Sequence, residues 1–477
     1  MSAYNCSLEH PTFGKCVHAD SPAARSPMQD AYSDIPELAD RESGRSLIRI
    51  PHEQNVPFTP RVRALVDTAE FQRLREISQL GLVARVYPGA RHSRFEHALG
   101  VYDNALRFLA QLRKDERFHK QVDRHAAEVL IVAALLHDLG HWPFCHPIED
   151  LALRGMPPHE ANAARFLAGD TELADVLRRQ WSIEPGEVLD VLVPRSDTPQ
   201  MRLMRTILSG PIDVDKMDYL ERDSLHCGVP YGRNFDKQRL IQSLVLNAAG
   251  DGLALTHKGK TAAELMVFAR YVMFSEVYWH HAVRSATSMF ARAFFELHGR
   301  LDLSELFGQT DAGMIAQMRS AAAGGPWEGL LSGVFGSQRR LYKRAAEFGH
   351  DQEDGGAVYS QLAGKPYPFV AQCAARLAER LSAETGQKVT SADVLIDAPP
   401  AHREVEFAVD IYFPKQDVYR PLRRVSPVVE ALARTQFDEY VKRVRVFVAP
   451  EFRDGARRIH AWEPLIEGSV ADVGACR

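Results

Sequence analysis

The stretch AALLHDLGHWPFCH, residues 133–146, ends an apolar run in three histidines and an aspartate. Apolar spacing over Ala126–Leu139 predicts a buried helix, with His137 and Asp138 side by side at its C-terminal end. Imidazole and carboxylate are ligands expected for a divalent ion, and neighbouring residues near a helix end can both reach one ion. The alternative is a helix end whose histidines cap the last carbonyls. A His-Asp pair without further candidates would favour that alternative.

Two further candidate ligands lie in other predicted helices. His97 follows Arg94 in the first turn of a helix predicted from Arg94 past Leu112, and Asp215 lies in a helix predicted over Ile212–Leu225. Two imidazoles and two carboxylates can hold one Mn, Fe, Zn or Mg ion and leave positions for water or phosphate oxygens. The sequence therefore predicts an open, catalytic type of metal site, with the ligands His97, His137, Asp138 and Asp215.

The bulk composition describes an ordinary globular protein and excludes several classes. The chain has 477 residues, 45% hydrophobic and 25% charged, and a net charge of −4 gives no overall reason for nucleic-acid binding. No apolar run approaches a membrane span, and the N-terminus lacks the apolar core of a signal peptide. The six cysteines are scattered without a C-x-x-C pair, which favours reduced thiols in a cytoplasmic protein.

Patterning along the chain predicts a mainly α fold with a small C-terminal α/β lobe. We interpret residues 1–45, rich in Ser, Pro, Asp and Ala, as a mobile or loosely attached leader. A helical core is expected over 46–300 and a helical extension over 301–385, whose shorter helices are broken by Gly-rich loops. The segment 386–477 alternates apolar and polar residues as strands do.

Several elements can be predicted individually from periodicity and turn residues. The helices predicted in addition to those above are Ala69–Leu80, a long aromatic helix Thr261–Leu297, and Ser426–Tyr440. The predicted strands are Ser46–Ile50, Gly252–His257, Val394–Asp397, Val405–Phe413 and Val441–Val448.

Five motifs occur in the order found in HD-domain deoxynucleoside triphosphate (dNTP) triphosphohydrolases. They are FQRLR with QLG (71–75 and 79–81), PGARHSRFEHALGV (88–101), HDLGHWPFCH (137–146), HE (159–160) and VDKMDYLERD (214–223). The chain resembles the branch of the vertebrate enzyme with a sterile-alpha-motif domain, and no such domain is visible in this sequence. The resemblance covers residues 46–300 strongly and is weaker beyond them. One motif is modest support, whereas five in order are strong.

The resemblance implies hydrolysis of a dNTP at the α-phosphorus to a deoxynucleoside and inorganic triphosphate. The metal ion would polarise a phosphate oxygen and lower the pKa of bound water, and further Mg²⁺ would accompany the nucleotide. Among the implied catalytic residues, His146 is the general acid and Glu149 stands where the family has the aspartate that orients it. His141, His159 and Glu160 would surround the phosphates and the water.

The resemblance also implies a set of substrate-binding residues. Arg94 would contact the α-phosphate, while Lys216 and Arg270 would contact other phosphate oxygens. Tyr278 would pack against the 2′ carbon, which leaves no room for a 2′-hydroxyl. Gln79, Tyr219 and Asp223 would hold the sugar, and Leu80 is a further substrate-binding position.

Two features concern specificity and regulation. Trp142 replaces a glycine common in the family, and a bulky indole there is expected to narrow or reshape the pocket. Asp67, Gln72 and Arg75 match residues that bind an activating nucleotide, GTP or a dNTP, between subunits, so a homo-oligomer, dimer or tetramer, is expected. The alternative is that Gln72, Arg73 and Arg75 form a solvated helix face.

Two other functions remain open at this point. One is an HD phosphohydrolase for another nucleotide, such as a monophosphate or an alarmone; the cations Arg94, Lys216 and Arg270 together favour a triphosphate. The other is a nucleic-acid-binding or sensing protein with a vestigial site, supported only by the basic stretch Arg420–Arg445.

Overall fold

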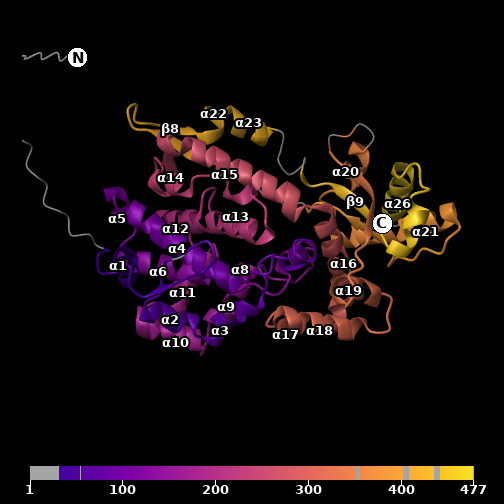
Figure 1. The fold of residues 1–477 in the computed structure, drawn as a ribbon, viewed down its shortest axis with the longest axis horizontal. Helices are drawn as coiled ribbons and strands as arrows, with labels where there is room; N and C mark the ends of the chain where they lie inside the picture. The colour runs from indigo at the N-terminus through magenta and orange to yellow at the C-terminus, as the bar shows by residue number, and fades with distance from the viewer. Residues whose placement is uncertain are drawn as a thin grey trace, which may run out of the picture.

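A computed structural model of the chain shows a mainly helical protein, as predicted. The structure describes residues 32–53, 55–350, 352, 355–400, 408–434 and 441–475. Residues 32–273 form one helical body, most of the later chain extends from it along the long axis of the molecule, and residues 410–434 lie back against the body (Figure 1). No helix in the described part combines the length and apolar character of a membrane span.

The helical body contains the segments that carry the motifs. Its α-helices are α1 (Pro36–Ser43), α2 (Pro60–Val66), α3 (Ala69–Gln72), α4 (Arg94–Leu112), α5 (Glu116–Gln121), α6 (Arg124–Leu136), α7 (Cys145–Glu149), α8 (His159–Asn162), α9 (Ala164–Leu167), α10 (Glu172–Val176), α11 (Pro185–Leu192), α12 (Pro199–Ser209), α13 (Val214–Cys227), α14 (Lys237–Gln242) and α15 (Lys260–Met273).

The centre of the body is α4, which packs against both α6 and α13 (Figure 1). Every residue of α6 from Ala126 to Leu136 is buried, which explains its continuous apolar run. Asp123 caps the N-terminus of α6 by accepting from the Ala126 N–H, and Asp213 does the same for α13 through the Lys216 N–H. These caps fix where α6 and α13 begin, two of the three helices that bring in the predicted metal donors.

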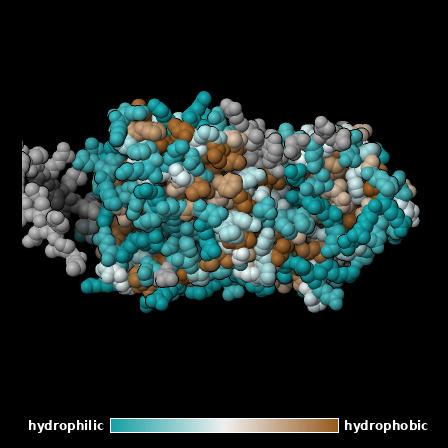
Figure 2. Space-filling model, turned by 45° about the horizontal axis from the view of Figure 1, so that its top comes forward, coloured by the Kyte–Doolittle hydropathy of each residue, from teal (hydrophilic) through white to brown (hydrophobic). Residues whose placement is uncertain are grey.

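The remaining helices follow α15 in the chain. They are α16 (His281–Leu297), α17 (Leu303–Leu306), α18 (Asp311–Ala322), α19 (Glu328–Phe335), α20 (Gly356–Leu362), α21 (Tyr367–Thr385), α22 (Leu422–Val425), α23 (Pro427–Arg434), α25 (Arg453–Ala456) and α26 (Glu463–Ala475). Figure 2 shows a mostly hydrophilic face with some hydrophobic residues near its middle.

The strands of the described residues form three small sheets. The first pairs β1 (Leu47–Ile48) with β2 (Val56–Pro57). The second has the order β3-β4-β7-β8, from β3 (Leu244–Leu246), β4 (Leu253–Thr256), β7 (Asp410–Phe413) and β8 (Val418–Pro421), with β4 and β7 parallel. The third has the order β5-β9-β6, from β5 (Lys343–Phe348), β9 (Val444–Val448) and β6 (Val394–Asp397).

The C-terminal strands divide between two sheets, and the sheet of β5, β9 and β6 belongs to a small α/β lobe with its own hydrophobic cluster. β7 and β8 complete the sheet begun by β3 and β4 of the helical body, whereas β6 and β9 pair with β5 of the expected extension. Both sheets cross the boundary expected at residue 386, because strand pairing joins segments distant in sequence. The predicted strand Val405–Phe413 is shorter, since β7 begins at Asp410 and residues 401–407 lie outside the described ones.

Four other predictions need correction or limits. The expected leader includes α1, where Leu38 is buried in the main core, while residues 1–31 lie outside the described ones. The helix predicted over Ala69–Leu80 ends at Glu76, because Ser78 forms a bridge with Ser93. A π-helical turn separates α15 from α16, so the long aromatic helix is two helices. Only Pro427–Arg434 of the helix predicted to Tyr440 is described.

Candidate active site and metal centre

The four predicted metal donors converge from three helices. His97 Nε2 lies 3.2 Å from His137 Nε2 and 3.0 Å from Asp215 Oδ1, and Asp138 Oδ1 lies 3.4 Å from His137 Nε2. Bonds of about 2.0 to 2.2 Å to one ion place neighbouring nitrogen and oxygen donors roughly 3 to 3.5 Å apart. The observed separations therefore fit donors arranged around a common cation.

The electrostatics at this point also suit a cation. Burial lowers the pKa of His97, but hydrogen bonds with Asp215 and Asp218 outweigh it and raise the pKa to about 10. The same carboxylates would stabilise a divalent ion, whose ligand must be the neutral imidazole. Burial raises the pKa of Asp138, but Arg94 and the surrounding imidazoles hold it well below its usual range. Asp138 is therefore an ionised carboxylate, as a metal ligand requires.

The loop after Asp138 is held by close packing and by a buried arginine. A Cβ on Gly140 would lie 2.0 Å from the His159 carbonyl oxygen, so only glycine lets the loop approach α8 this closely. Arg73 donates 2.8 Å hydrogen bonds to the carbonyls of Leu139 and His141. The hypothesis that Arg73 belongs to a solvated helix face is therefore wrong: this side chain braces the loop.

Three histidines and two carboxylates form one wall of the cavity next to the metal donors. The rings of His141 and His159 lie 3.8 Å apart, and His146 is 5.4 Å from His141. Glu149 Oε1 accepts from the His159 backbone N–H at 2.8 Å and lies 2.9 Å from Nδ1, while Glu149 Oε2 lies 3.7 Å from His146 Nδ1. Burial raises the pKa of Glu149, but both histidines outweigh it and lower the pKa far below its usual range.

Glu160 belongs to the same wall of the cavity. The imidazoles of His141 and His159 differ in their protonation. Glu160 Oε1 lies 3.3 Å from His159 Nε2. Burial lowers the pKa of His159, but Glu149 outweighs it and raises the pKa. Burial and the nearby Arg94 lower the pKa of His141 well below its usual value, so this imidazole is neutral.

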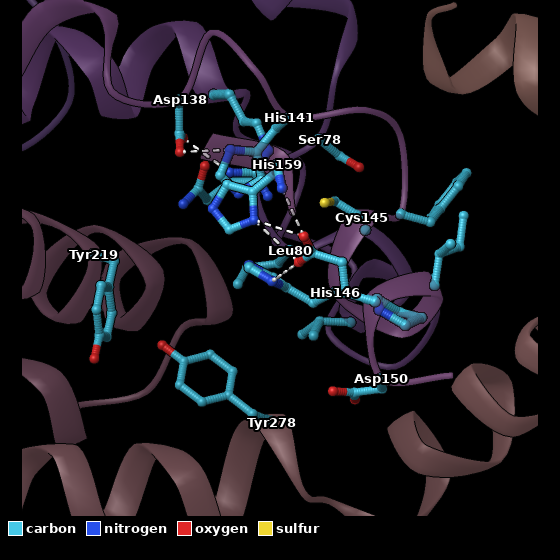
Figure 3. Close-up of a pocket in the computed structure, with 18 of the residues that line it drawn as sticks. Ser78, Leu80, Asp138, His141, Cys145, His146, Asp150, His159, Tyr219 and Tyr278 are labelled. Carbon is cyan, nitrogen blue, oxygen red and sulfur yellow. Dashed lines mark hydrogen bonds and ion pairs between the residues drawn. The ribbon is translucent and has the colours of Figure 1, made fainter. Parts of the chain in front are cut away.

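The predicted substrate-binding residues face the same cavity. Tyr219 and Tyr278 lie across the space from His141 and His159 (Figure 3). The Tyr278 hydroxyl donates to Asp223 Oδ2 at 2.6 Å. The cavity has a volume of about 880 Å³, and every predicted metal, catalytic and substrate-binding residue lines it, including Gln79, Leu80, Arg94, Lys216 and Arg270.

The cations near the metal donors are already partly engaged. Arg94 Nη1 donates to Asp138 Oδ2 at 2.9 Å. Lys216 Nζ donates to Asp213 Oδ2 at 2.6 Å and to the Gly210 carbonyl at 3.0 Å. Both side chains keep further N–H donors, because a guanidinium has five and an ammonium three.

Trp142 does not face the pocket, contrary to expectation. Its side chain is fully buried and stacks on Phe307, with ring centroids 4.2 Å apart. Phe307 and Trp142 belong to a hydrophobic cluster behind the loop, which is separate from the main core. The indole therefore anchors the loop from outside the cavity and does not narrow it.

The residues predicted to bind an activating nucleotide lie elsewhere. Gln72 Oε1 accepts from Arg75 Nε at 2.7 Å, and the Arg75 guanidinium lies 3.7 Å from the centre of the Phe95 ring. Asp67 is exposed at the C-terminus of α2. None of the three lines the cavity, and their role in activation stays a prediction.

Sequence reasoning missed several residues of the site. Asp218 lies 2.8 Å from His97 Nδ1, and Cys145 lines the cavity beside the histidines. His92, which does not line the cavity, is buried and lies 2.9 Å from Oδ1 of Asp223, which lines it. The spacing of three residues between Asp215 and Asp218 on one helix face could have indicated the first of these.

Comparison with known proteins agrees with this geometry. Residues 94–223 match the HD domain and residues 235–462 match the HD associated region. The fold and the convergent His-Asp donors therefore define an HD-domain protein. The chain thus carries an HD domain, as the motifs predicted, followed by an HD associated region.

Relatives extend the match beyond the HD domain. The chain is 38% identical to the protein YwfO of Bacillus subtilis over 46% of this chain and 48% of that protein. It is 28% identical to the deoxynucleoside triphosphate triphosphohydrolase SAMHD1 homolog of Dictyostelium discoideum over 57% of this chain and 53% of that protein. The chain thus spans about half the length of these relatives. A crystal structure of a hypothetical Aquifex aeolicus protein superposes with a TM-score of 0.65 at 25% identity, covering 86% of this chain and 98% of that one.

Proposed function

We propose that the protein hydrolyses dNTPs to a deoxynucleoside and inorganic triphosphate. The observation that carries this proposal is the shared cavity. It is lined by Arg94, Lys216 and Arg270 together with the four predicted metal donors and the rings of Tyr219 and Tyr278. Several cations suit the several charges of a triphosphate. A volume of about 880 Å³ also lies within the range of small-molecule sites. The similarity to the D. discoideum triphosphohydrolase homolog points to the same substrate class.

The chain supplies a complete set of groups for this reaction. A divalent ion held by His97, His137, Asp138 and Asp215 would polarise a phosphate oxygen and lower the pKa of bound water. Arg94, already beside Asp138, orients the α-phosphate with its remaining donors. Glu149 faces His146 Nδ1 and thereby leaves Nε2 to protonate the departing 5′-oxygen. His146 is suited to exchange protons because its side chain is 65% exposed.

The residues across the cavity from the histidines, among them Tyr278 and Asp223, would select the sugar. Asp223 holds the Tyr278 hydroxyl, so the ring has a fixed position. A ring fixed against the 2′ carbon would exclude a 2′-hydroxyl by steric contact. Gln79 Oε1 is buried without a hydrogen-bond partner among the described residues, so it is available to accept from a bound nucleotide.

The two alternatives have less support. A monophosphate carries fewer charges than the three cations Arg94, Lys216 and Arg270 can bind. In the basic stretch Arg420–Arg445, Lys442 and Arg445 are buried, and Arg445 Nε donates to Glu347 at 2.6 Å. These two cations are therefore not available to a nucleic-acid backbone.

Product identification tests the proposal. The metal-loaded protein is incubated with each dNTP and NTP, with and without GTP, and the products are separated. Inorganic triphosphate with a deoxynucleoside is expected, and GTP acceleration would support activation through Asp67, Gln72 and Arg75. Pyrophosphate with a monophosphate, or no turnover of any triphosphate, would refute the proposal. His137→Ala should abolish turnover, whereas the matched control His125→Ala, at an exposed histidine, should not.

A further inference from the structure

A second cluster of ligating side chains lies beside the four metal donors. It consists of His141, Cys145 and His159, whose ligand atoms all lie within 4.8 Å of one another. All three residues line the cavity, and Figure 3 shows the Cys145 sulfur directed towards the two imidazoles. The thiol lies at the start of α7 and the histidines lie before α7 and at the start of α8. Two imidazoles and a thiol are a donor set typical of zinc.

His141 has an unsatisfied ring nitrogen in this cluster. The residue is 4% exposed, and its Nδ1 has no hydrogen-bond partner among the described residues. Asp138 Oδ1 lies 3.1 Å from this atom but without hydrogen-bonding geometry. A buried nitrogen without a partner is costly, and a bound ligand would remove that cost.

His159 is oriented as a metal ligand commonly is. Glu149 Oε1 lies 2.9 Å from its Nδ1, so Nε2 is the ring nitrogen that remains for a ligand. A carboxylate on one imidazole nitrogen fixes the tautomer and raises the basicity of the other.

We propose that His141, Cys145 and His159 form a second cation site for a borderline ion such as Zn²⁺, with its fourth position taken by water. The thiolate selects against Mg²⁺ and Mn²⁺, which prefer oxygen ligands. Binding replaces the S–H bond of Cys145 by a metal–sulfur bond, and the proton leaves to solvent. Bonds of about 2.0 to 2.3 Å place tetrahedral donors ~3.5 Å apart, so the side chains close in slightly on binding.

The second site adjoins the first but does not depend on it. Asp138 Oδ1 lies 3.4 Å from His137 Nε2 and 3.1 Å from His141 Nδ1, so this carboxylate faces both clusters. The second site requires no particular nucleotide. An ion bound there would occupy His141 and His159, which are otherwise assigned to phosphate and water, so excess Zn²⁺ should inhibit turnover.

Cobalt substitution tests the site without reference to activity. The metal-free full chain is titrated with Co²⁺, and a thiolate-to-cobalt charge-transfer band is followed in the near ultraviolet while bound metal is counted by mass spectrometry. Two ions per chain and a charge-transfer band are expected. No band in the wild-type protein would overturn the proposal.

Variants assign the band and separate the two sites. Cys145→Ser should abolish the band and remove one ion, whereas Cys373→Ser, at a buried cysteine of another hydrophobic cluster, should leave both unchanged. His137→Ala should lose an ion but keep the band. A band that survives Cys145→Ser would overturn the second site, whatever the outcome for nucleotide hydrolysis. If Cys145→Ser does not fold, His159→Gln tests the site in its place. It should also lose the band, and a band that survives would overturn the second site.

Discussion

His97 Nδ1 lies 2.8 Å from Asp218 Oδ2, and this contact fixes the imidazole whose other nitrogen faces the metal donors. Arg222 donates to both Asp218 oxygens at 2.8 Å. Burial raises the pKa of Asp218, but Arg222 and His97 outweigh it and lower the pKa far below its usual range. An ionised Asp218 keeps the proton on Nδ1, so Nε2 presents its lone pair to an ion.

Removing the charge of Asp218 should weaken metal binding. In Asp218→Asn, His97 loses its anionic partner and becomes a poorer donor, so we expect metal affinity to fall about 10- to 100-fold. Competition with a chelator measures the affinity. Asp197→Asn, at an exposed carboxylate, is the matched control and should bind metal as the wild type does. An unchanged affinity in folded Asp218→Asn would show that this contact is only structural.

Trp142 should contribute to stability and not to nucleotide choice. Trp142→Ala removes a fully buried ring that stacks on Phe307, so a loss of about 3 to 5 kcal/mol in the free energy of unfolding is expected. Denaturant unfolding measures this loss, and Trp142→Phe should show a smaller one. Relative turnover among the four dNTPs should stay constant, since the ring lies outside the cavity. A changed base preference without loss of stability would contradict this.

The orientation of Trp142 shows where prediction from sequence stops. Helix periodicity was sufficient to predict the helix before His137. The resemblance to the family's motifs was sufficient to select residues that line one cavity. The direction of the indole depends on Phe307, which is distant in sequence and belongs to no motif. Likewise, alternation predicted a strand near Asp410 but not its parallel pairing with β4, because a strand pattern does not specify its partner.

A buried ion network away from the site gives a pH-dependent prediction. Glu53 is buried, and its carboxylate accepts from Lys237 Nζ at 2.6 Å and from Arg107. Burial raises the pKa of Glu53, but Lys237 and Arg107 outweigh it and lower the pKa below 4.5. A carboxyl whose pKa is depressed on folding stabilises the protein above its unfolded pKa, and this stabilisation is lost as the pH falls through the folded value.

Glu53→Gln should therefore destabilise the protein most at neutral pH. The change removes one of two carboxylate partners from each cation, since Lys237 also lies 2.9 Å from Glu221 and Arg107 also pairs with Asp103, so a cost of about 1.5 to 3 kcal/mol is expected. Urea unfolding of both proteins at pH 7, and at steps below about pH 4.5, measures the difference, which should shrink as the pH falls. Glu42→Gln, at an exposed carboxylate paired with Arg113, should change stability little at any pH. A difference independent of pH would show that the ion network is not its source.

The Tyr278 ring should decide between deoxyribose and ribose if the proposed function is right. Asp223 accepts from the hydroxyl at 2.6 Å and so fixes the ring that would contact the 2′ carbon. Tyr278→Ala removes the ring and should lower the ratio of kcat/KM for a dNTP to that for the matching NTP by at least about tenfold, or ~1.4 kcal/mol. Steady-state kinetics with dATP and ATP, and with dGTP and GTP, measures the ratio.

Tyr278→Phe separates the ring from its hydroxyl. The variant keeps the steric barrier but leaves Asp223 without the Tyr278 donor, so selectivity should persist even if the KM for the dNTP changes. Loss of selectivity in Tyr278→Phe would show that the hydrogen bond to Asp223, and not the ring, discriminates deoxyribose from ribose. Retention of selectivity in Tyr278→Ala would exclude the ring as its source and leave Gln79, Tyr219 or Asp223 as the residues that read the sugar.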